Sequence, residues 1–490
     1  MSDIDKTINP IVGLSARELS QEIHKRSLSC SEVMEAYLER IDEVNPKVNA
    51  IVALRNKDEL LKEAKEKDEL LAKGKSDGWM HGFPQAIKDL EDTKGIPSTN
   101  GYLGDAGRLP EEDSLLVTSM KNAGSIIIGK TNTPEWGFGS QTYNEVYGAS
   151  GNPYNPQLTP GGSSGGTACA VALNMQAVAD GSDFMGSLRN PAGFCNIFGF
   201  RPSWGRVASL GPDLFYQNCA VKGPMARTVP DLALLLSTLS GYDGRVPSSL
   251  EDDANLGKLT PDNVCTSLEK NISGHKIAWM GDLDGYLPME DGVLEVCESA
   301  LKKLERDAKV ATEPLKPFFD PEMFWEKIWL PIRHFSASAL KPLYDNVDKR
   351  KLLKPEAVFE YESSLKYSAA DLYEAGVARS EFFTSVLEVF KEFDFIAVPT
   401  AQVFPFDKTI CWPKEIAGKK MDSYFRWMEV VSHWTMTGCP VAAVPAGFSK
   451  DGRPMGIQII GKPRSDFELL QFAYGYEQVQ LEVIGCRAVV

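Results

Sequence analysis

Histidine is scarce in this chain, and its few positions follow no spacing used by metal sites. Five histidines occur among 490 residues, and none belongs to a His-Glu-x-x-His pair. The Gly-x-Ser-x-Gly elbow of many hydrolases is also absent around Ser187. We therefore expect the histidines to be structural, no metal to be bound, and any acid–base chemistry to rest on other side chains.

Paired cysteines, long apolar runs and excess positive charge are lacking as well. The nine cysteines are odd in number and form no Cys-x-x-Cys motif, which is typical of reduced thiols. No apolar run approaches the roughly 18 to 20 residues that span a bilayer, and residues 1–6 (MSDIDK) are too polar for a signal peptide. A formal net charge of -15 disfavours binding to nucleic acid or an anionic membrane. We predict a cytoplasmic protein with neither partner.

Residues 1–75 have the pattern of a helical layer. Ser15 and Ser29 are each followed three positions later by glutamate, which is the signature of a capping box at a helix start. Residues 57–73 form a charged, helix-favouring run. We expect these helices to pack on the surface of the protein.

From about residue 76 the pattern changes to alternating strands and helices. Short apolar runs at 125–129, 395–399 and 456–460 predict strands of an α/β fold, while residues 264 to about 385 read as helical and aromatic-rich. Strands from both the middle and the end of the chain favour one intertwined domain. Within it we distinguish the N-terminal layer 1–75, a core 76–240, a helical region 241–430 and a C-terminal part 431–490.

A glycine- and serine-rich segment, residues 161–166 (GGSSGG), precedes an alanine-rich helical stretch. Such a segment can be a flexible linker. A glycine-rich turn that leads into a buried helix also suits an anion-binding or catalytic loop. The lysine of a phosphate-binding loop is missing, so that interpretation is excluded.

A second candidate loop follows a predicted strand at residues 177–183. The turn after it could present Ser187 to a carbonyl carbon and direct the backbone N–H groups of Phe184, Met185, Gly186 and Ser187 to the carbonyl oxygen. The alternative is that Ser187 merely caps a helix.

Lys88 ends a short apolar segment, residues 83–87. Most lysines are solvated surface charges, and this is the alternative here. Burial at the end of a strand would instead lower the pKa of Lys88 and let it act as a base. A pair with the neighbouring Asp89 would oppose that effect.

Together these segments resemble the amidase signature family. The match holds in order and spacing at residues 87–89, 94–99, 129–132, 160–166, 186–189, 200–207, 437–440 and 454–458. The resemblance implies a single large α/β domain with a mixed central β-sheet covered by helices on both faces. It also implies an amidase that needs no metal or organic cofactor and takes a small-molecule amide, with a homodimer left open.

The resemblance implies a Ser–cis-Ser–Lys triad as well. Carried over, Ser187 is the nucleophile, Ser163 is the bridging serine after a cis peptide bond, and Lys88 is the base. Ser164 and Asp183 would orient the site.

The same resemblance assigns Arg189 the role of anchoring the loop behind Ser187. The family pattern Asp-Thr-Gly-Gly-Ser departs here to DFMGS, with Met185 in place of a glycine. We expect the Met185 side chain to narrow the acyl site or change the loop, without excluding catalysis.

The region 241–430 would hold the substrate specificity. Its aromatic residues predict an aryl or otherwise hydrophobic carboxamide, with ordinary helix packing as the alternative: Phe318, Phe319, Phe324, Trp325, Trp329, Phe335, Tyr344, Trp412, Phe425 and Trp427, with Trp434 just beyond it. Two other functions remain open. One is the glutaminase subunit of a tRNA-dependent amidotransferase, which the same family contains, and the other is a non-enzymatic binding protein.

Overall fold

Helices and strands alternate along most of the chain in the computed structural model, which describes residues 9–215, 219–488 and 490. The prediction about a signal peptide falls on residues 1–6, outside the described residues. The strands are β1 (Ile51–Val52), β2 (Pro84–Lys88), β3 (Ile126–Thr131), β4 (Val178–Asp183), β5 (Phe198–Arg201), β6 (Val221–Ala226), β7 (Lys276–Trp279), β8 (Ala311–Pro314), β9 (Phe395–Pro399), β10 (Glu415–Ile416), β11 (Lys419–Lys420), β12 (Val441–Phe448) and β13 (Pro454–Ile460).

The α-helices vary from single turns to the long α16. They are α1 (Pro10–Gly13), α2 (Ala16–His24), α3 (Cys30–Val48), α4 (Lys57–Ala72), α5 (Leu115–Asn122), α6 (Gly165–Ala172), α7 (Asn190–Phe194), α8 (Val229–Leu239), α9 (Val264–Leu268), α10 (Val293–Ala308), α11 (Pro321–Phe324), α12 (Leu330–Ser336), α13 (Lys341–Tyr344), α14 (Val347–Arg350), α15 (Pro355–Ser364), α16 (Ala369–Glu392), α17 (Glu429–Thr437), α18 (Asp466–Val479) and α19 (Leu481–Ile484).

The large sheet is mixed and runs in the order β4-β6-β5-β12-β13-β9-β7-β8. Neighbouring strands from β4 to β9 are antiparallel, whereas β7 pairs in parallel with both β9 and β8. A smaller sheet, β1-β3-β2, lies beside it and contacts β4 through β2. The β2 strand ends at Lys88 and β4 ends at Asp183, so two candidate site segments leave neighbouring strands.

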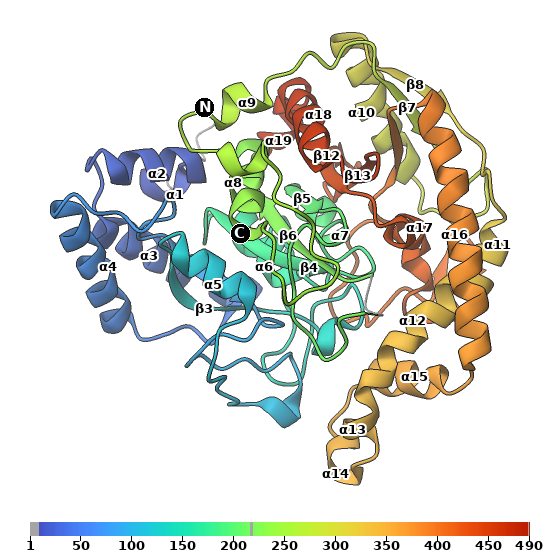
Figure 1. The fold of residues 1–490 in the computed structure, drawn as a ribbon, viewed down its shortest axis with the longest axis horizontal. Helices are drawn as coiled ribbons and strands as arrows, with labels where there is room; N and C mark the ends of the chain where they lie inside the picture. The colour runs from blue at the N-terminus through green and yellow to red at the C-terminus, as the bar shows by residue number, and fades with distance from the viewer. Residues whose placement is uncertain (1–8, 216–218, 489) are drawn as a thin grey trace.

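Helices cover both faces of the large sheet, as predicted. α8, α10 and α18 pack on β5, β6, β12 and β13, and α18 contacts both of the others. α6 and α7 contact β4, β6, β12 and β13. Figure 1 shows the strands enclosed between these helices, so the predicted single α/β domain with a mixed sheet is confirmed.

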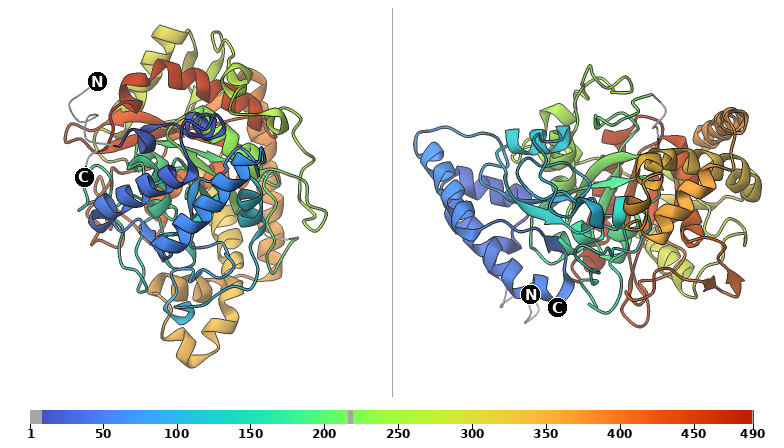
Figure 2. Two further views of the ribbon diagram at one scale, coloured as in Figure 1. Left: turned by 90° about the vertical axis from the view of Figure 1, so that its left-hand side faces the viewer. Right: turned by 90° about the horizontal axis from the view of Figure 1, so that it is seen from below.

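The two ends of the molecule are helical. α1 to α4 lie at one end and α11 to α16 at the other, with α13 and α14 projecting from the body (Figures 1 and 2). Both predicted capping boxes are present, with Ser15 before α2 and Ser29 before α3. The charged run 57–73 is α4, which buries only Leu60 and Ala64.

One part of the secondary-structure prediction is wrong. Residues 264–385 were expected to be helical, but they contain β7 and β8. Each is four residues long, and β7 is held by parallel pairing with β9, far along the chain. A short strand whose partner is remote carries little local signal. The division of the chain into four regions at residues 75, 240 and 430 is a separate matter and stays a prediction.

Two further sequence-based expectations can be compared with the fold. All nine cysteines lie among the described residues, and each is a thiol rather than part of a disulfide. Within the described ranges, none of the helices combines the length and the apolar character needed to cross a bilayer.

Candidate active site

Three predicted segments meet in one buried place. Lys88 is the last residue of β2, Ser163 lies in the turn before α6, and Ser187 lies in the turn between β4 and α7. All three side chains are buried, and the most exposed of them, Ser187, is 6% exposed. The peptide bond Gly162–Ser163 is cis. Residues 161–166 are all buried, so the glycine-rich segment is packed inside the protein and is not an exposed linker.

The Lys88 amine lies within hydrogen-bond distance of three hydroxyls. Its Nζ is 2.8 Å from Oγ of Ser163, 2.8 Å from Oγ of Ser164 and 2.9 Å from Oγ of Ser182. The alternative of a solvated surface lysine is wrong, since the side chain is 1% exposed. Ser182 was not predicted. Side chains alternate along a strand, so Ser182 and Asp180 share the face of β4 next to β2, and this alternation could have identified both.

Burial controls the charge of Lys88. Loss of hydration lowers the pKa of Lys88 to about 7, although the nearby carboxylates of Asp180, Asp183 and Glu91 favour the protonated amine. Near neutral pH a substantial fraction of Lys88 is therefore uncharged, as a proton acceptor must be.

Asp180 is a second buried group beside β2. Its carboxylate accepts the backbone N–H of Lys88 at 3.2 and 3.3 Å. Burial, with repulsion from Glu91, raises the pKa of Asp180 to about 6. Asp89 does not pair with the Lys88 amine. Its carboxylate instead accepts hydrogen bonds from the backbone N–H and the hydroxyl of Thr99.

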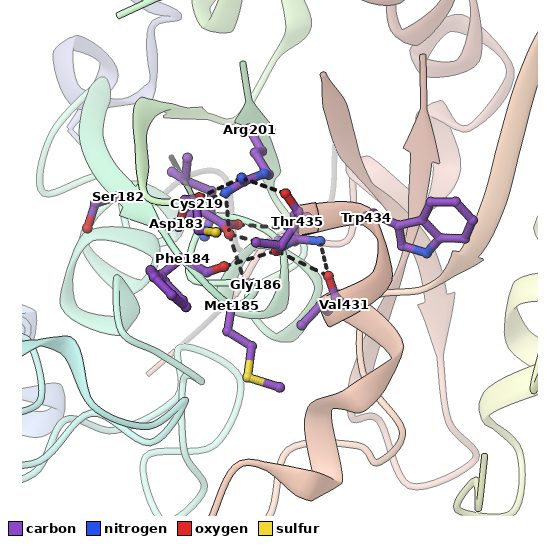
Figure 3. Close-up of polar contacts among 12 residues, drawn as sticks. Ser182, Asp183, Phe184, Met185, Gly186, Arg201, Cys219, Val431, Trp434 and Thr435 are labelled. Carbon is purple, nitrogen blue, oxygen red and sulfur yellow. Dashed lines mark hydrogen bonds and ion pairs between the residues drawn. The ribbon is translucent and has the colours of Figure 1, made fainter. Parts of the chain in front are cut away.

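The loop before Ser187 is built around the buried carboxylate of Asp183 (Figure 3). This carboxylate accepts the backbone N–H groups of Gly186 at 2.9 Å and Leu188 at 3.1 Å. It also pairs with Arg189 at 2.8 Å and Arg201 at 3.1 Å. Burial alone would raise the pKa of Asp183, but the two guanidinium groups hold it well below its usual range. The loop is thereby fixed around a permanent negative charge.

Arg189 uses all five of its N–H donors. Nε and Nη2 donate to the two oxygens of Asp183 at 2.9 and 2.8 Å. The other bonds reach the backbone oxygen of Val431, the side-chain oxygen of Gln458 and the hydroxyl of Thr435 at 2.7 to 2.8 Å. Arg189 thus fastens the loop to α17 and β13. Val431, Thr435 and Gln458 were not predicted, although residues 454–458 carry part of the family resemblance.

Several backbone N–H groups of this loop have no acceptor. Among the described residues, those of Phe184, Met185 and Ser187 donate no hydrogen bond, whereas that of Gly186 is already used by Asp183. Gly186 has a φ of 84°, and a Cβ there would lie 2.9 Å from Val431. Only glycine suits this position. The alternative role of Ser187 as a helix cap is wrong, because Arg189 is the N-cap residue of α7.

A cavity of about 230 Å³ opens beside the three serines Ser163, Ser182 and Ser187. The rest of its wall is mainly apolar and aromatic and includes Leu90, Trp136, Phe138, Phe184, Met185, Ala220, Phe425 and Met428. Figure 3 shows the Met185 side chain pointing away from the contacts between Asp183 and Arg201. The methionine that departs from the family pattern thus becomes part of the cavity wall.

Most of the aromatic residues predicted to surround a cleft pack in the core instead. Of that set only Phe425 borders this cavity. Trp325, Trp329, Trp427 and Trp434 are completely buried by neighbouring side chains. The alternative of ordinary helix packing therefore holds for most of them. Trp136 and Phe138, which were not predicted, come from the turn after β3.

No metal centre accompanies this site in the described part of the chain, where no three His, Cys, Asp or Glu side chains are placed to hold an ion. His334 and His433 are buried, and each contacts aromatic rings.

Comparisons with known proteins find one matching family model and relatives of two kinds. A family model described as Amidase matches residues 32–470. The acylamidase of Rhodococcus erythropolis is 30% identical over 469 residues, covering 95% of each protein. A glutamyl-tRNA(Gln) amidotransferase subunit of a Cyanothece species is 31% identical over 491 residues, covering 95% of this chain and 97% of the other. The structure of a bacterial aryl acylamidase, described as an amidase signature enzyme, matches with a TM-score of 0.88 at 25% identity, covering 98% of this chain and 100% of that one.

Proposed function

This chain belongs to the amidase family, an amide-hydrolysing enzyme class, and we propose that it cleaves linear carboxamides through an ester on Ser187. The observation that carries the proposal is the 2.8 Å contact between the buried Lys88 amine and Ser163. It places a base with a pKa near neutrality next to a hydroxyl that borders the same cavity as Ser187.

The proposed reaction begins with proton removal, because a serine hydroxyl is a weak nucleophile. Ser187 Oγ attacks the carbonyl carbon, its proton passes to Ser163, and the Ser163 proton passes to neutral Lys88. The tetrahedral intermediate then collapses. Its C–N bond breaks while the proton returns through Ser163 to the leaving nitrogen. Water attacks the resulting ester by the same proton route and releases the acid and free Ser187.

Negative charge on the carbonyl oxygen needs donors that are fixed in advance. The free N–H groups of Phe184, Met185 and Ser187 are the proposed donors. Gly186 belongs to the same predicted oxyanion hole, but its N–H is bonded to Asp183, so we assign it the role of shaping the turn.

Four further residues hold this geometry in place. Ser164 and Ser182 position the Lys88 amine, and Asp183 with Arg189 fixes the loop that carries Ser187.

The substrate proposed is an aryl or otherwise apolar amide, because aromatic and aliphatic side chains form most of the cavity wall. Within the proposed region 241–430, Arg333, Glu360 and Phe425 reach this cavity, which supports a role for that region in specificity. The acylamidase and aryl acylamidase among the relatives support the same choice. A cytoplasmic location, a homodimer and the lack of nucleic-acid and membrane partners stay predictions.

The first test is hydrolysis of an amide panel by wild type and Ser187→Ala. The panel contains an aryl amide, an anilide, a fatty amide and glutamine, and the released amine or ammonia is measured. We expect wild type to hydrolyse an aryl or apolar amide and Ser187→Ala to be inactive. Activity on glutamine alone would favour the glutaminase of an amidotransferase. Activity that survives Ser187→Ala would show that Ser187 is not the nucleophile.

The pH dependence of kcat/KM provides a separate test of Lys88 as the base. Because only neutral Lys88 accepts a proton, kcat/KM should rise with pH and level off above about 7. The Asp180 carboxylate favours protonated Lys88, so Asp180→Asn should move this rise to lower pH. Asp307→Asn, which changes a surface carboxylate paired with Arg306, should leave the profile unchanged. A rise that stays in place or moves to higher pH in Asp180→Asn would contradict the assignment.

A further inference from the structure

A buried arginine forms part of the cavity wall. Arg333 of α12 is 7% exposed and borders the same cavity as Ser187. Its guanidinium carbon lies 4.2 Å from the ring centre of Phe425 and 5.7 Å from that of Phe184. A positive, hydrogen-bonding group therefore stands within an otherwise mainly apolar pocket, and the proposed reaction gives it no role.

The hydrogen bonds of Arg333 leave part of its capacity unused. Nη2 donates to the hydroxyl of Tyr424 at 2.8 Å and lies 2.5 Å from the Glu360 carboxylate. Among the described residues, Nη1 donates only to the sulfur of Met185, at 3.6 Å, and a thioether is a weak acceptor. In the described structure Nε has no partner at all. Since a buried donor without an acceptor is unfavourable, a stronger acceptor in the cavity would be favoured.

The charge of Arg333 is already balanced. Glu360 pairs with it at 2.5 Å, accepts the Tyr424 hydroxyl at 2.5 Å and lies 2.8 Å from Nδ1 of His334. Burial opposes ionisation of Glu360, but the charge of Arg333 and the hydrogen bonds from His334 and Tyr424 hold its pKa below the usual value. A substrate carboxylate would add a buried negative charge without a counter-charge, which is costly. A neutral oxygen acceptor would not.

We propose that Arg333 is a specificity-determining residue, which selects amides whose apolar or aryl group carries a neutral hydrogen-bond acceptor such as a carbonyl oxygen. The proposal rests on the proposed function and narrows its substrate class. It also gives Met185 a role, because the side chain that departs from the family pattern contacts Arg333. A substrate acceptor would replace this weak sulfur contact with a bond to oxygen.

Matched substrate pairs test the proposal. One pair is 4-acetylbenzamide and 4-isopropylbenzamide, and the other is N-(4-acetylphenyl)acetamide and N-(4-isopropylphenyl)acetamide. Members of a pair have similar shapes, but only the acetyl member carries a carbonyl oxygen on its ring substituent as an additional hydrogen-bond acceptor. The readout is the acetyl-to-isopropyl ratio of kcat/KM in each enzyme, because electronic differences between the substrates cancel when enzymes are compared.

The main variant is Arg333→Met/Glu360→Gln, which removes both charges together. The glutamine oxygen still accepts the Tyr424 hydroxyl, and its NH2 group can donate to Nδ1 of His334 when that imidazole carries its proton on Nε2. We expect the ratio in at least one pair to fall about 10-fold or more relative to wild type, as for loss of a hydrogen bond to a charged group. In Arg333→Lys the ammonium group should stay paired with Glu360 and leave no donor for the substrate, so the ratio should fall in this variant too. This variant replaces the double variant if the latter does not fold. Arg350→Met, at an arginine that stacks on Tyr344 outside the cavity wall, is the control and should leave the ratio unchanged.

Two results would overturn the proposal. One is an unchanged ratio in both pairs for the folded variants, and the other is a wild-type preference for 4-carboxybenzamide over 4-acetylbenzamide. Calorimetric binding of the same probes to Ser187→Ala, with and without the Arg333 substitutions, gives the ratio without turnover. Absence of hydrolysis by wild type would therefore count against the proposed function, while the binding ratio would still decide the role of Arg333.

Discussion

Replacing Lys88 with methionine is expected to lower kcat by about 100- to 10,000-fold, which is the usual contribution of a general base. Methionine has a similar length and no charge, so it fills the space of the neutral amine without the cost of burying a cation. Ser163 would then have no group to receive its proton. The remaining activity should also lose the rise with pH that Lys88 gives to wild type, and a pH series of kcat measures both effects.

Lys130→Met is the matched control. Lys130 lies on the neighbouring strand β3 and is fully buried, but it bonds to the Glu91 carbonyl oxygen and the Thr93 hydroxyl rather than to the serines. The Lys130→Met substitution should lower the stability of the folded protein but leave kcat within about tenfold of wild type. It removes a buried charge without changing any group that transfers the proton. A kcat for Lys88→Met that is equally close to wild type would remove Lys88 from the role of base.

The segments of the candidate site could be predicted because each carries strong local signals. The glycines of residues 161–166, the strand-ending lysine and the turn before Ser187 are visible in short stretches, and the family resemblance supplied their order. The signals for capping boxes at Ser15 and Ser29 are equally local, since each motif is contained in four consecutive residues. Where a feature depends only on neighbours in sequence, as these capping boxes do, the structure shows it at the predicted residues.

The rest could not be predicted, because it depends on contacts between distant segments. Arg333 of α12 acquires its importance only when Glu360 of α15, Tyr424 and Met185 of the turn after β4 come together around it. The aromatic residues failed as predictors for a related reason. Helical periodicity identifies a buried face but does not tell whether that face meets a cavity or another helix.

Asp180 shows how the fold joins these distant parts. Its carboxylate links β4, an edge strand of the large sheet, to the backbone of Lys88 in the small sheet. Gln85 makes a second link, because its amide donates to the backbone oxygen of Val178 at 3.0 Å. The position of Lys88 relative to Ser182 and to the loop that follows β4 is thus set by contacts between two sheets, which no single stretch of sequence contains.

Asp183→Asn is expected to destabilise the folded protein by about 3 to 5 kcal/mol, the usual cost of breaking a buried ion pair. The substitution keeps the shape of the side chain but leaves Arg189 and Arg201 buried without their counter-charge. The amide also cannot accept every bond that now reaches the two carboxylate oxygens, so the turn at Gly186 and Leu188 should loosen and kcat should fall. Urea unfolding at neutral pH measures the first effect and amide hydrolysis the second.

The sign of the pH effect strengthens this test. Because the folded-state pKa of Asp183 is lowered, its ionisation stabilises the protein above the ordinary aspartate pKa, and the stabilisation is lost as pH falls toward the lowered value. The difference in unfolding free energy between wild type and Asp183→Asn should therefore shrink on acidification. Asp451→Asn, which removes a surface partner of Arg453, should change stability by less than about 1 kcal/mol at every pH. If Asp183→Asn behaves like this surface variant, Asp183 does not hold the loop together, and another contact must keep Ser187 in place.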